Sequence, residues 1–175
     1  MIEKNVNQKL LNEDVSAKAL VDLIDENEAQ LDLSGAILYH RFPLFSSGDS
    51  TVAARVMIIS AKHGILIFQC TEQTERTLDA NNIQMLKDEL AQTNSLLYSI
   101  LLTSRLLRKS PTILKFDVIP IIFAPYFSGE GNVFNDDWKE LIVVRNLDEL
   151  KSALTTQDRT EPIESKIIRD TMAIL

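Results

Sequence analysis

The hydrophobic residues of this 175-residue chain follow two repeats, one typical of helices and one typical of strands. Apolar residues at steps of three and four predict helices at about 15–29, 81–109, 149–154 and from 162 to the C-terminus. Short apolar runs between turn residues predict five strands, at 35–44, 52–60, 65–71, 113–125 and 141–146. The order is therefore helix, three strands, long helix, two strands and two short helices.

This order predicts an α/β domain of three layers, in which a central mixed sheet of about five strands is flanked by helices. The three early strands form a meander, which suits antiparallel pairing, and the long helix can cross over to a parallel strand. Strands 52–60 and 65–71 are apolar on both faces, as expected at the centre of a covered sheet. Pro120 in the fourth strand indicates a bulge or the sheet edge.

The helix at 81–109 has the strongest periodic signal in the chain. Its last turn is expected to hold Arg105, Arg108 and Lys109, where cations complement the helix dipole. The first helix is expected to begin at an Asn12 or Asp14 cap, and its buried stripe to consist of Val15, Leu20, Leu23 and Ile24. The turn between the two central strands contains Gly64, which suits a positive φ.

The composition argues against a secreted protein, a membrane protein and a protein that binds nucleic acid over a broad surface. Eighteen basic and 25 acidic residues give a net charge of −7, which argues against broad binding to nucleic acid or to an anionic membrane. The single Cys70 excludes an internal disulfide, and the polar N-terminus is no signal peptide. The longest apolar run, "VIPIIFAPYF", is too short to span a bilayer. We therefore expect a cytoplasmic protein that does not bind membranes.

The domain organisation is expected to be simple. Residues 1–158 are predicted to form one α/β domain, and residues 159–175 a C-terminal helix that could begin a linker to a following domain. The segment "TTQDRTEP" before that helix is polar, as linkers are. The final "AIL" has no capping glycine, which indicates that a parent chain continues.

The hairpin "RVMIISAKHGILIFQCTEQ", residues 55–73, resembles a known family. It is similar to the hairpin of PD-(D/E)XK, or restriction-endonuclease-like, domains, as found in nuclease-related domains at the N-terminus of bacterial superfamily-one helicases. In that family an Asp opens the second strand and Glu-x-Lys-Gly ends the third. Laid on this chain without a gap, those catalytic positions carry Arg55, Gln69 and Thr71. The resemblance covers roughly residues 12–155, including "ELAQTNSLLYSILLTSRLLRK" and "FDVIPIIFAP".

These substitutions remove the chemistry that the family uses. Carboxylates of that fold hold Mg²⁺, which activates water, and the Lys stabilises the developing charge. Gln69 offers a neutral oxygen, Thr71 a hydroxyl, and Arg55 repels a cation. The family's first-helix Glu falls within "SAKAL", which offers Lys18 instead. The resemblance therefore implies a nuclease fold with no catalytic residue, metal or other cofactor.

The resemblance also implies a role and partners. The domain would be an accessory or interaction module of a helicase-like protein in nucleic-acid processing or phage defence, and its partner a protein or a following helicase domain. The parent chain would be an ATP-dependent helicase. One alternative is an active nuclease with relocated ligands, for which Asp49 is the candidate. Another is a domain that binds nucleic acid without catalysis, through a local basic patch of Arg105, Arg108 and Lys109.

Arg55 is expected to stand where the ion would be, with its guanidinium toward the Gln69 Oε1 atom or the Thr71 hydroxyl. An unpaired Arg there would be costly, so a carboxylate from Asp49 or from the first helix should approach it. Cys70 alternates away from Gln69 and is expected to be a small buried hydrophobe. His40 and His63 are expected at a strand end and at the surface, because two His and one Cys supply too few zinc ligands.

Overall fold

The computed structural model describes residues 1–74, 76, 77, 79–127, 142–156 and 163–175. These residues form a six-stranded mixed sheet in the order β1-β2-β3-β4-β7-β8. Its strands are β1 (Glu3–Asn5), β2 (Ile37–Ser47), β3 (Ser50–Ser60), β4 (Gly64–Cys70), β7 (Val118–Phe123) and β8 (Ile142–Val144). The β2-β3-β4 meander is antiparallel, and β1, β7 and β8 each run parallel to a neighbour. The α/β class and the mixed sheet are confirmed.

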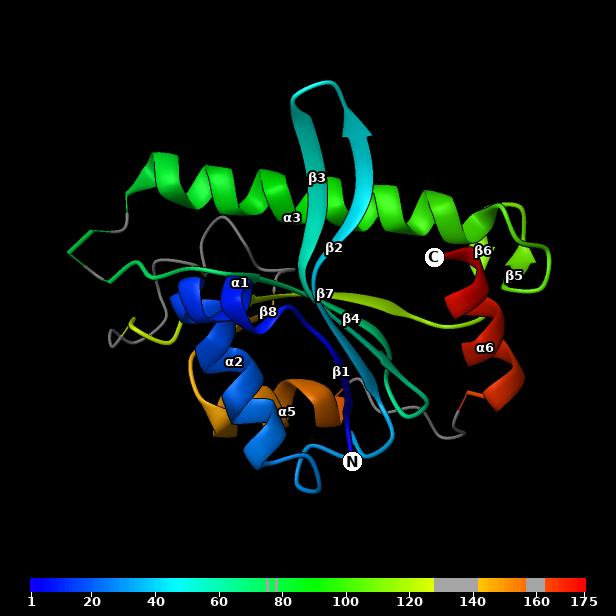
Figure 1. Ribbon diagram of the computed structural model, residues 1–175, viewed down its shortest axis with the longest axis horizontal. Coiled ribbons are helices and arrows are strands. Elements are labelled where there is room, and N and C mark those ends of the chain that lie inside the picture. The colour runs from blue at the N-terminus through cyan, green and yellow to red at the C-terminus, as the bar shows by residue number, and fades with distance from the viewer. Residues whose placement is uncertain (75, 78, 128–141, 157–162) are drawn as a thin grey trace.

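Helices lie on both faces of this sheet (Figure 1). One face carries α1 (Gln8–Glu13), α2 (Val15–Glu26) and α5 (Leu147–Thr156), and the other carries α3 (Ala80–Leu102) and α6 (Ser165–Ile174). Strand alternation divides the core accordingly: Ile58 and Leu66 face α2 and α5, whereas Ile59 and Ile65 face α3 and α6. Apolar residues on both faces therefore did indicate central strands, as predicted.

The chain between β4 and β7 crosses over by way of α3. This connection makes β4 and β7 parallel neighbours, with Gln69 opposite Ile122 and Cys70 opposite Phe123. The predicted antiparallel pairing of the 56–60 and 64–70 strands is confirmed as well. Helix α6 packs on the same core as α3 through Ile167 and Ile168, and Ile163 before the helix packs there as well. The division at residue 158 stays a prediction, and residues 157–162 lie outside the described ones.

The long helix is shorter than its apolar pattern predicts. It ends at Leu102, and the chain continues through turns into a small ribbon of β5 (Arg108–Ser110) and β6 (Ile113–Leu114). Leu107 is fully buried, as the helical repeat predicts, but it lies in a turn and not in the helix. Its carbonyl accepts a hydrogen bond from the Lys115 N–H. The expectation that Arg105, Arg108 and Lys109 occupy the last helical turn is therefore wrong.

The N-terminal region also differs from the prediction. The residues before Val15 form β1 and α1, which the sequence pattern did not reveal because all three residues of β1 are exposed. Val15 is 55% exposed rather than buried. Asp14 ends α1, donating its N–H to the Leu11 carbonyl, and directly precedes α2. One residue therefore joins two helices at a sharp change of direction.

Pro120 lies inside the sheet, between β4 and β8, rather than at its edge or at a bulge. It pairs with Ile67 of β4. Within the described residues, however, β8 pairs with β7 only from Ile121 to Phe123.

The β2–β3 hairpin extends beyond the rest of the sheet as an arm. Figure 1 shows it crossing α3 and projecting past it. The predicted loop "SSGDS" shrinks to a turn at Gly48 and Asp49, and β2 continues through Pro43 with a register shift before Phe45. Strand β3 pairs with β4 only from Val56 onward, so residues 50–54 pair with β2 alone among the described residues.

Gly64 is required at the turn into β4. Its φ is +93°, and a Cβ there would collide with the backbone carbonyl of Asp117. We expect Gly64→Ala to lower the free energy of unfolding by about 2–4 kcal/mol, because backbone strain and overpacking add. Urea denaturation measures this loss.

Gly48→Ala is the matched control, since its φ is +58° and nothing lies within 4 Å of the added Cβ. It should cost about 1 kcal/mol, the strain alone. Equal losses in the two variants would contradict the steric role of Asp117.

Candidate functional site

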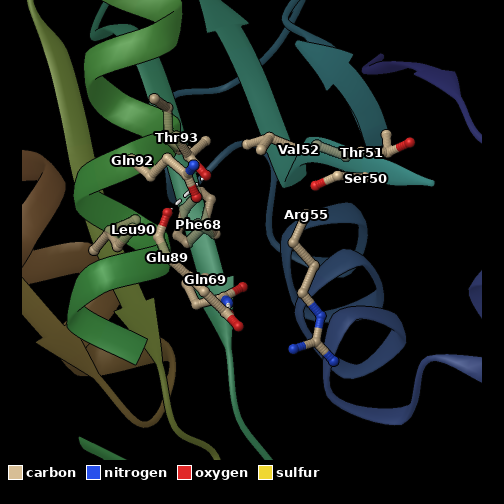
Figure 2. Close-up of a pocket in the computed structure, with 12 residues that line it drawn as sticks. Ser50, Thr51, Val52, Arg55, Phe68, Gln69, Glu89, Leu90, Gln92 and Thr93 are labelled. Carbon is tan, nitrogen blue, oxygen red and sulfur yellow. Dashed lines mark hydrogen bonds between the residues drawn. The ribbon is translucent and has the colours of Figure 1, made fainter. Parts of the chain in front are cut away.

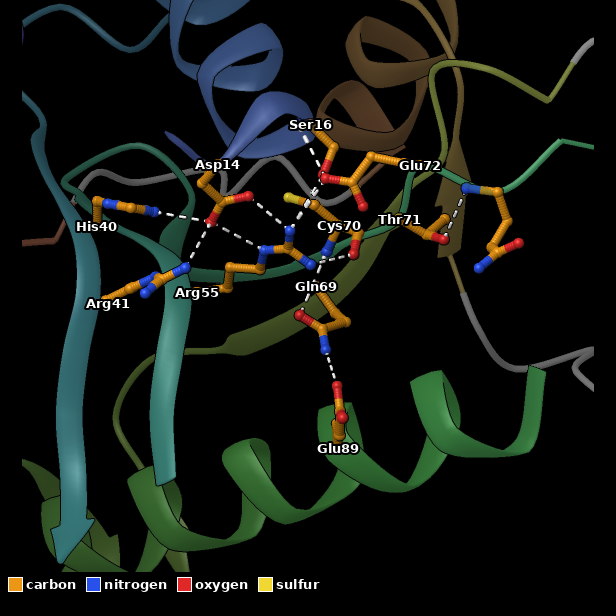
Figure 3. A network of polar contacts seen from close by, with 11 residues as sticks. Asp14, Ser16, His40, Arg41, Arg55, Gln69, Cys70, Thr71, Glu72 and Glu89 are labelled. Carbon is orange, nitrogen blue, oxygen red and sulfur yellow. Dashed lines mark hydrogen bonds and ion pairs between the residues drawn. The ribbon is translucent and has the colours of Figure 1, made fainter. Parts of the chain in front are cut away.

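A polar cluster surrounds the Arg55 guanidinium where β3 separates from β4 (Figure 3). Arg55 donates to both carboxylate oxygens of Asp14, over 2.5 Å from Nη2 to Oδ1 and 3.1 Å from Nε to Oδ2. Its Nη1 donates to the Cys70 carbonyl over 2.5 Å. Its Nη2 also lies 3.3 Å from the Ser16 hydroxyl and 3.4 Å from Glu72 Oε1. The cation is thus held by oxygens of α2, β4 and the residues that flank them.

Asp14 is the centre of this cluster. Only 1% of its side chain is exposed, and its Oδ2 also lies 2.9 Å from His40 Nε2 and 3.8 Å from Arg41. Burial alone would raise the pKa of Asp14, but hydrogen bonds from Arg55 and His40 outweigh it and lower the pKa to about 2. The carboxylate is therefore charged at neutral pH, because its neighbours stabilise the charge.

The local backbone turns Arg55 toward this cluster. Ala54 and Met57 both contribute to the core under α3, whereas Val56 belongs to the opposite core. Regular alternation would put Ala54 and Met57 on opposite faces, so the strand is irregular at Arg55. Opposite it, Arg41 has a φ of +55°. This distortion leaves the guanidinium on the α2 side, in reach of Asp14.

Gln69 and Thr71 do not join the cluster through their side chains. Gln69 Nε2 donates to the Glu89 carboxylate of α3, and the Thr71 hydroxyl accepts from the Gln73 N–H over 3.1 Å. The expectation that Arg55 hydrogen-bonds to the side chain of Gln69 or Thr71 is therefore wrong. The expectation that a carboxylate approaches Arg55 is confirmed by Asp14, with Glu72 as a second.

The other candidate residues lie apart from the cluster. Asp49 is exposed in the turn at the tip of the β2–β3 arm. Arg105, Arg108 and Lys109 lie beyond the C-terminal end of α3, and Arg108 donates to the carbonyl of Leu102 there. Since Glu89 and Leu102 are separated by about 20 Å along the helix axis, the basic residues do not border the site.

Buried histidine and cysteine side chains have structural roles. His40 lies within β2 rather than at its end and contacts Asp14. His63 is buried, with its Nε2 3.0 Å from the Leu31 carbonyl, and is not at the surface as expected. Cys70 is buried, as predicted, and burial raises the pKa of its thiol to about 12. Its contribution to the cluster is the backbone carbonyl.

The cluster stabilises the positive charge of the Arg55 side chain. Within the described residues, no group of three or more His, Cys, Asp and Glu side chains could hold a metal ion. The two carboxylates that approach each other here, Asp14 and Glu72, both contact Arg55. A bidentate Arg–carboxylate pair of this kind is strong and geometrically specific.

Two cavities that share lining residues open on the α3 side of the cluster, and Figure 2 shows the larger. The larger, about 290 Å³, lies between residues 50–53 of β3, residues 67–69 of β4 and the α3 side chains Glu89, Gln92 and Thr93. The smaller, about 170 Å³, includes Glu72 and Asn82. Both cavities are lined by Arg55, Gln69 and Glu89. We call the two cavities together the β3–α3 groove.

Sequence reasoning missed several members of the cluster. Asp14 was considered only as a helix cap, His40 as a strand end, and Ser16 not at all. One available signal was His40 within the otherwise apolar run "GAILYH", because a buried polar side chain needs a partner. Another was the close spacing of Asp14 and Ser16, which puts two acceptors at the start of one helix.

Comparisons with protein-family models, with curated proteins and with solved structures found no match. Among the described helices, none has the length and apolar character needed to cross a membrane.

The pKa of Asp14 predicts a pH dependence of stability. Its ordinary value is 3.8 and its value in the fold is about 2, so the stabilisation is complete above pH 4 and lost as the pH falls toward 2. The loss from this group should be about 2 kcal/mol. Because Arg145 also lowers the pKa of Glu149, the test compares the wild type with Asp14→Asn, whose unfolding free energy should depend less on pH in this range.

Asp14→Asn should also lower the free energy of unfolding at neutral pH by about 3 kcal/mol, because it leaves Arg55 without its buried partner. Asp25→Asn is the control, since Asp25 is 42% exposed and pairs with Lys4 at the surface. It should change stability by less than about 1 kcal/mol. Similar losses in both variants would contradict the central role of Asp14.

Proposed function

We propose that this chain is a restriction-endonuclease-like domain without a catalytic metal site, which acts as an accessory interaction module. Its parent is a helicase-like cytoplasmic protein that processes nucleic acids or defends against phage, and its partner is a protein or a following helicase domain. The helicase, its ATP dependence and its role in the cell come from the resemblance of the hairpin and of the long helix with its following strand.

The order of elements supports the fold assignment within this proposal. A helix precedes an antiparallel meander of three strands, and α3 then leads to β7, which lies parallel to β4. This is the helix–strand–strand–strand–helix–strand order on which the resemblance rests. The position that aligns with the family's Asp also lies where β3 and β4 separate, beside the α2 terminus.

The observation that carries the proposal is the environment of the Arg55 guanidinium. Two carboxylates and a backbone carbonyl surround it, and such oxygens are the ligands that hard divalent cations prefer. Here they bind a side-chain cation that cannot be deprotonated and cannot activate water. A second cation among the same ligands would be repelled by Arg55, so these residues favour a structural role over phosphodiester cleavage.

Nucleic-acid binding is the weaker alternative. The chain carries a net charge of −7, and its candidate basic residues lie at the far end of α3 from the groove. Phosphate contacts would need several cations on one face. The proposal therefore favours a protein partner.

Wild-type protein should neither cleave DNA nor gain stability in Mn²⁺. A ligand at 100 times its dissociation constant would stabilise the fold by about 2.7 kcal/mol, so a melting curve detects binding readily. Single-stranded and double-stranded DNA with Mn²⁺ test cleavage. A melting shift that is lost on Asp49→Ala, together with cleavage, would instead favour a nuclease with relocated ligands.

Arg55→Ala provides the sharper test of the cation's role. Removing the side chain leaves Asp14, Glu72 and the Cys70 carbonyl around the vacated position, so Mn²⁺ should raise the melting temperature of this variant only. Arg145→Ala, which removes an Arg that pairs with Glu149 away from the cluster, is the matched control and should show no Mn²⁺ effect. An equal response of wild type and Arg55→Ala would contradict the proposal.

A further inference from the structure

The free edge of β3 borders the β3–α3 groove. Residues 50–54 pair with β2 on one side, and within the described residues no strand pairs with them on the other, because the β3–β4 pairing ends at Val56 and Phe68. The larger cavity lies at this place, with residues 50–53 as one wall. In a strand, alternate residues direct their N–H and C=O groups to each side, so part of the wall consists of main-chain donors and acceptors.

The shape of the groove matches an extended chain. Strand β3 forms one wall, and Glu89, Gln92 and Thr93 of α3 form the opposite wall (Figure 2). Residues 67–69 of β4 also line the space. A peptide that occupied this space would continue the sheet where β4 leaves it. Such strand addition derives affinity from main-chain hydrogen bonds and specificity from alternate side chains.

The charge of the groove selects among extended partners. Its charged lining residues are Arg55, Glu72 and Glu89. The charge of Arg55 is already matched by buried Asp14, whereas Glu89 is exposed and contacts only the neutral Gln69 among its described partners. The remaining charge is therefore negative, as is that of the whole chain at −7. This disfavours a nucleic acid or a second copy of this chain as the occupant, and favours a basic peptide.

We propose that the β3–α3 groove binds an extended basic segment of a protein partner, which pairs with residues 50–55 of β3 and places a Lys or Arg beside Glu89. This inference rests on the proposed function, since it specifies the partner of the interaction module. The partner strand becomes a new neighbour of β3, and its cationic side chain competes with Gln69 for the Glu89 carboxylate.

The test uses residues 1–175 and fluorescent synthetic peptides of three kinds. One alternates lysine with valine and threonine, one replaces lysine with glutamate, and one keeps the lysines but carries a central proline that cannot donate to a strand. Anisotropy should detect binding of the first alone. Hydrogen exchange should then slow at the alternate amides of residues 50–55 that face the groove, because pairing with the peptide protects them.

Variants on α3 locate the site. Glu89→Lys should weaken binding of the lysine peptide by roughly tenfold or more, because attraction becomes repulsion. Asp88→Lys makes the same charge change at an exposed neighbour that does not line the groove, and it should keep nearly wild-type affinity. Gln92→Trp should fill the groove and block binding, whereas Gln84→Trp on the same helix should not. All four positions are exposed, and melting curves verify the fold.

Several outcomes would overturn the inference. These are no binding of the lysine peptide, equal losses in Glu89→Lys and Asp88→Lys, protection outside residues 50–55, or protection of those residues by single-stranded DNA. The metal tests are separate measurements. Cleavage with Mn²⁺ would defeat the proposed function whatever the peptides do, and failure of peptide binding would leave the Arg55→Ala result unchanged.

Discussion

The buried ion pair of Asp14 and Arg55 is the constraint on which this end of the molecule depends. A carboxylate whose side chain is 1% exposed is tolerable only with compensating partners, and these come from separate elements. Asp14 contacts Arg55 of β3 and His40 of β2, and the Arg55 guanidinium also donates to the Cys70 carbonyl of β4. The α1–α2 junction is thereby fixed against three adjacent strands. The same contacts set the direction in which β3 leaves the sheet, and so the opening of the groove.

The central part of the fold could be predicted because burial on two faces leaves a strong pattern. Strands 56–60 and 64–70 carry apolar residues on both faces, and Gly64 marks the turn between them. Elements with weak or misleading patterns were missed. Strand β1 is exposed at the sheet edge, and Leu107 continues the helical repeat of α3 although a turn carries it into the core. Periodicity reports which residues are buried, and it does not report whether the backbone between them is helical.

The sequence could predict that Arg55 needs a carboxylate partner, but it could not predict the side of the sheet to which Arg55 points. The need of Arg55 for a carboxylate follows from the cost of an unpaired charge, and Asp14 supplies it. The direction depends on an irregularity of β3 that places Ala54 and Met57 in the same core, and on the positive φ of Arg41. No residue type in these positions demands that conformation. Gln69 consequently contacts α3 while Arg55 contacts the α2 side.

The two edges of the β2–β3 arm differ in how readily they could pair with a strand of another copy of the chain. A two-stranded ribbon with open edges can template fibrillar assembly. The outer edge of β2 carries Pro43, which lacks an N–H, followed by a register shift that interrupts a flat edge. The opposite edge, residues 50–54, has neither proline nor charge and borders the β3–α3 groove. Access of a second ribbon to this edge is therefore limited by the α3 side chains across the groove, and moving α3 away from the arm would leave an aggregation-prone edge open.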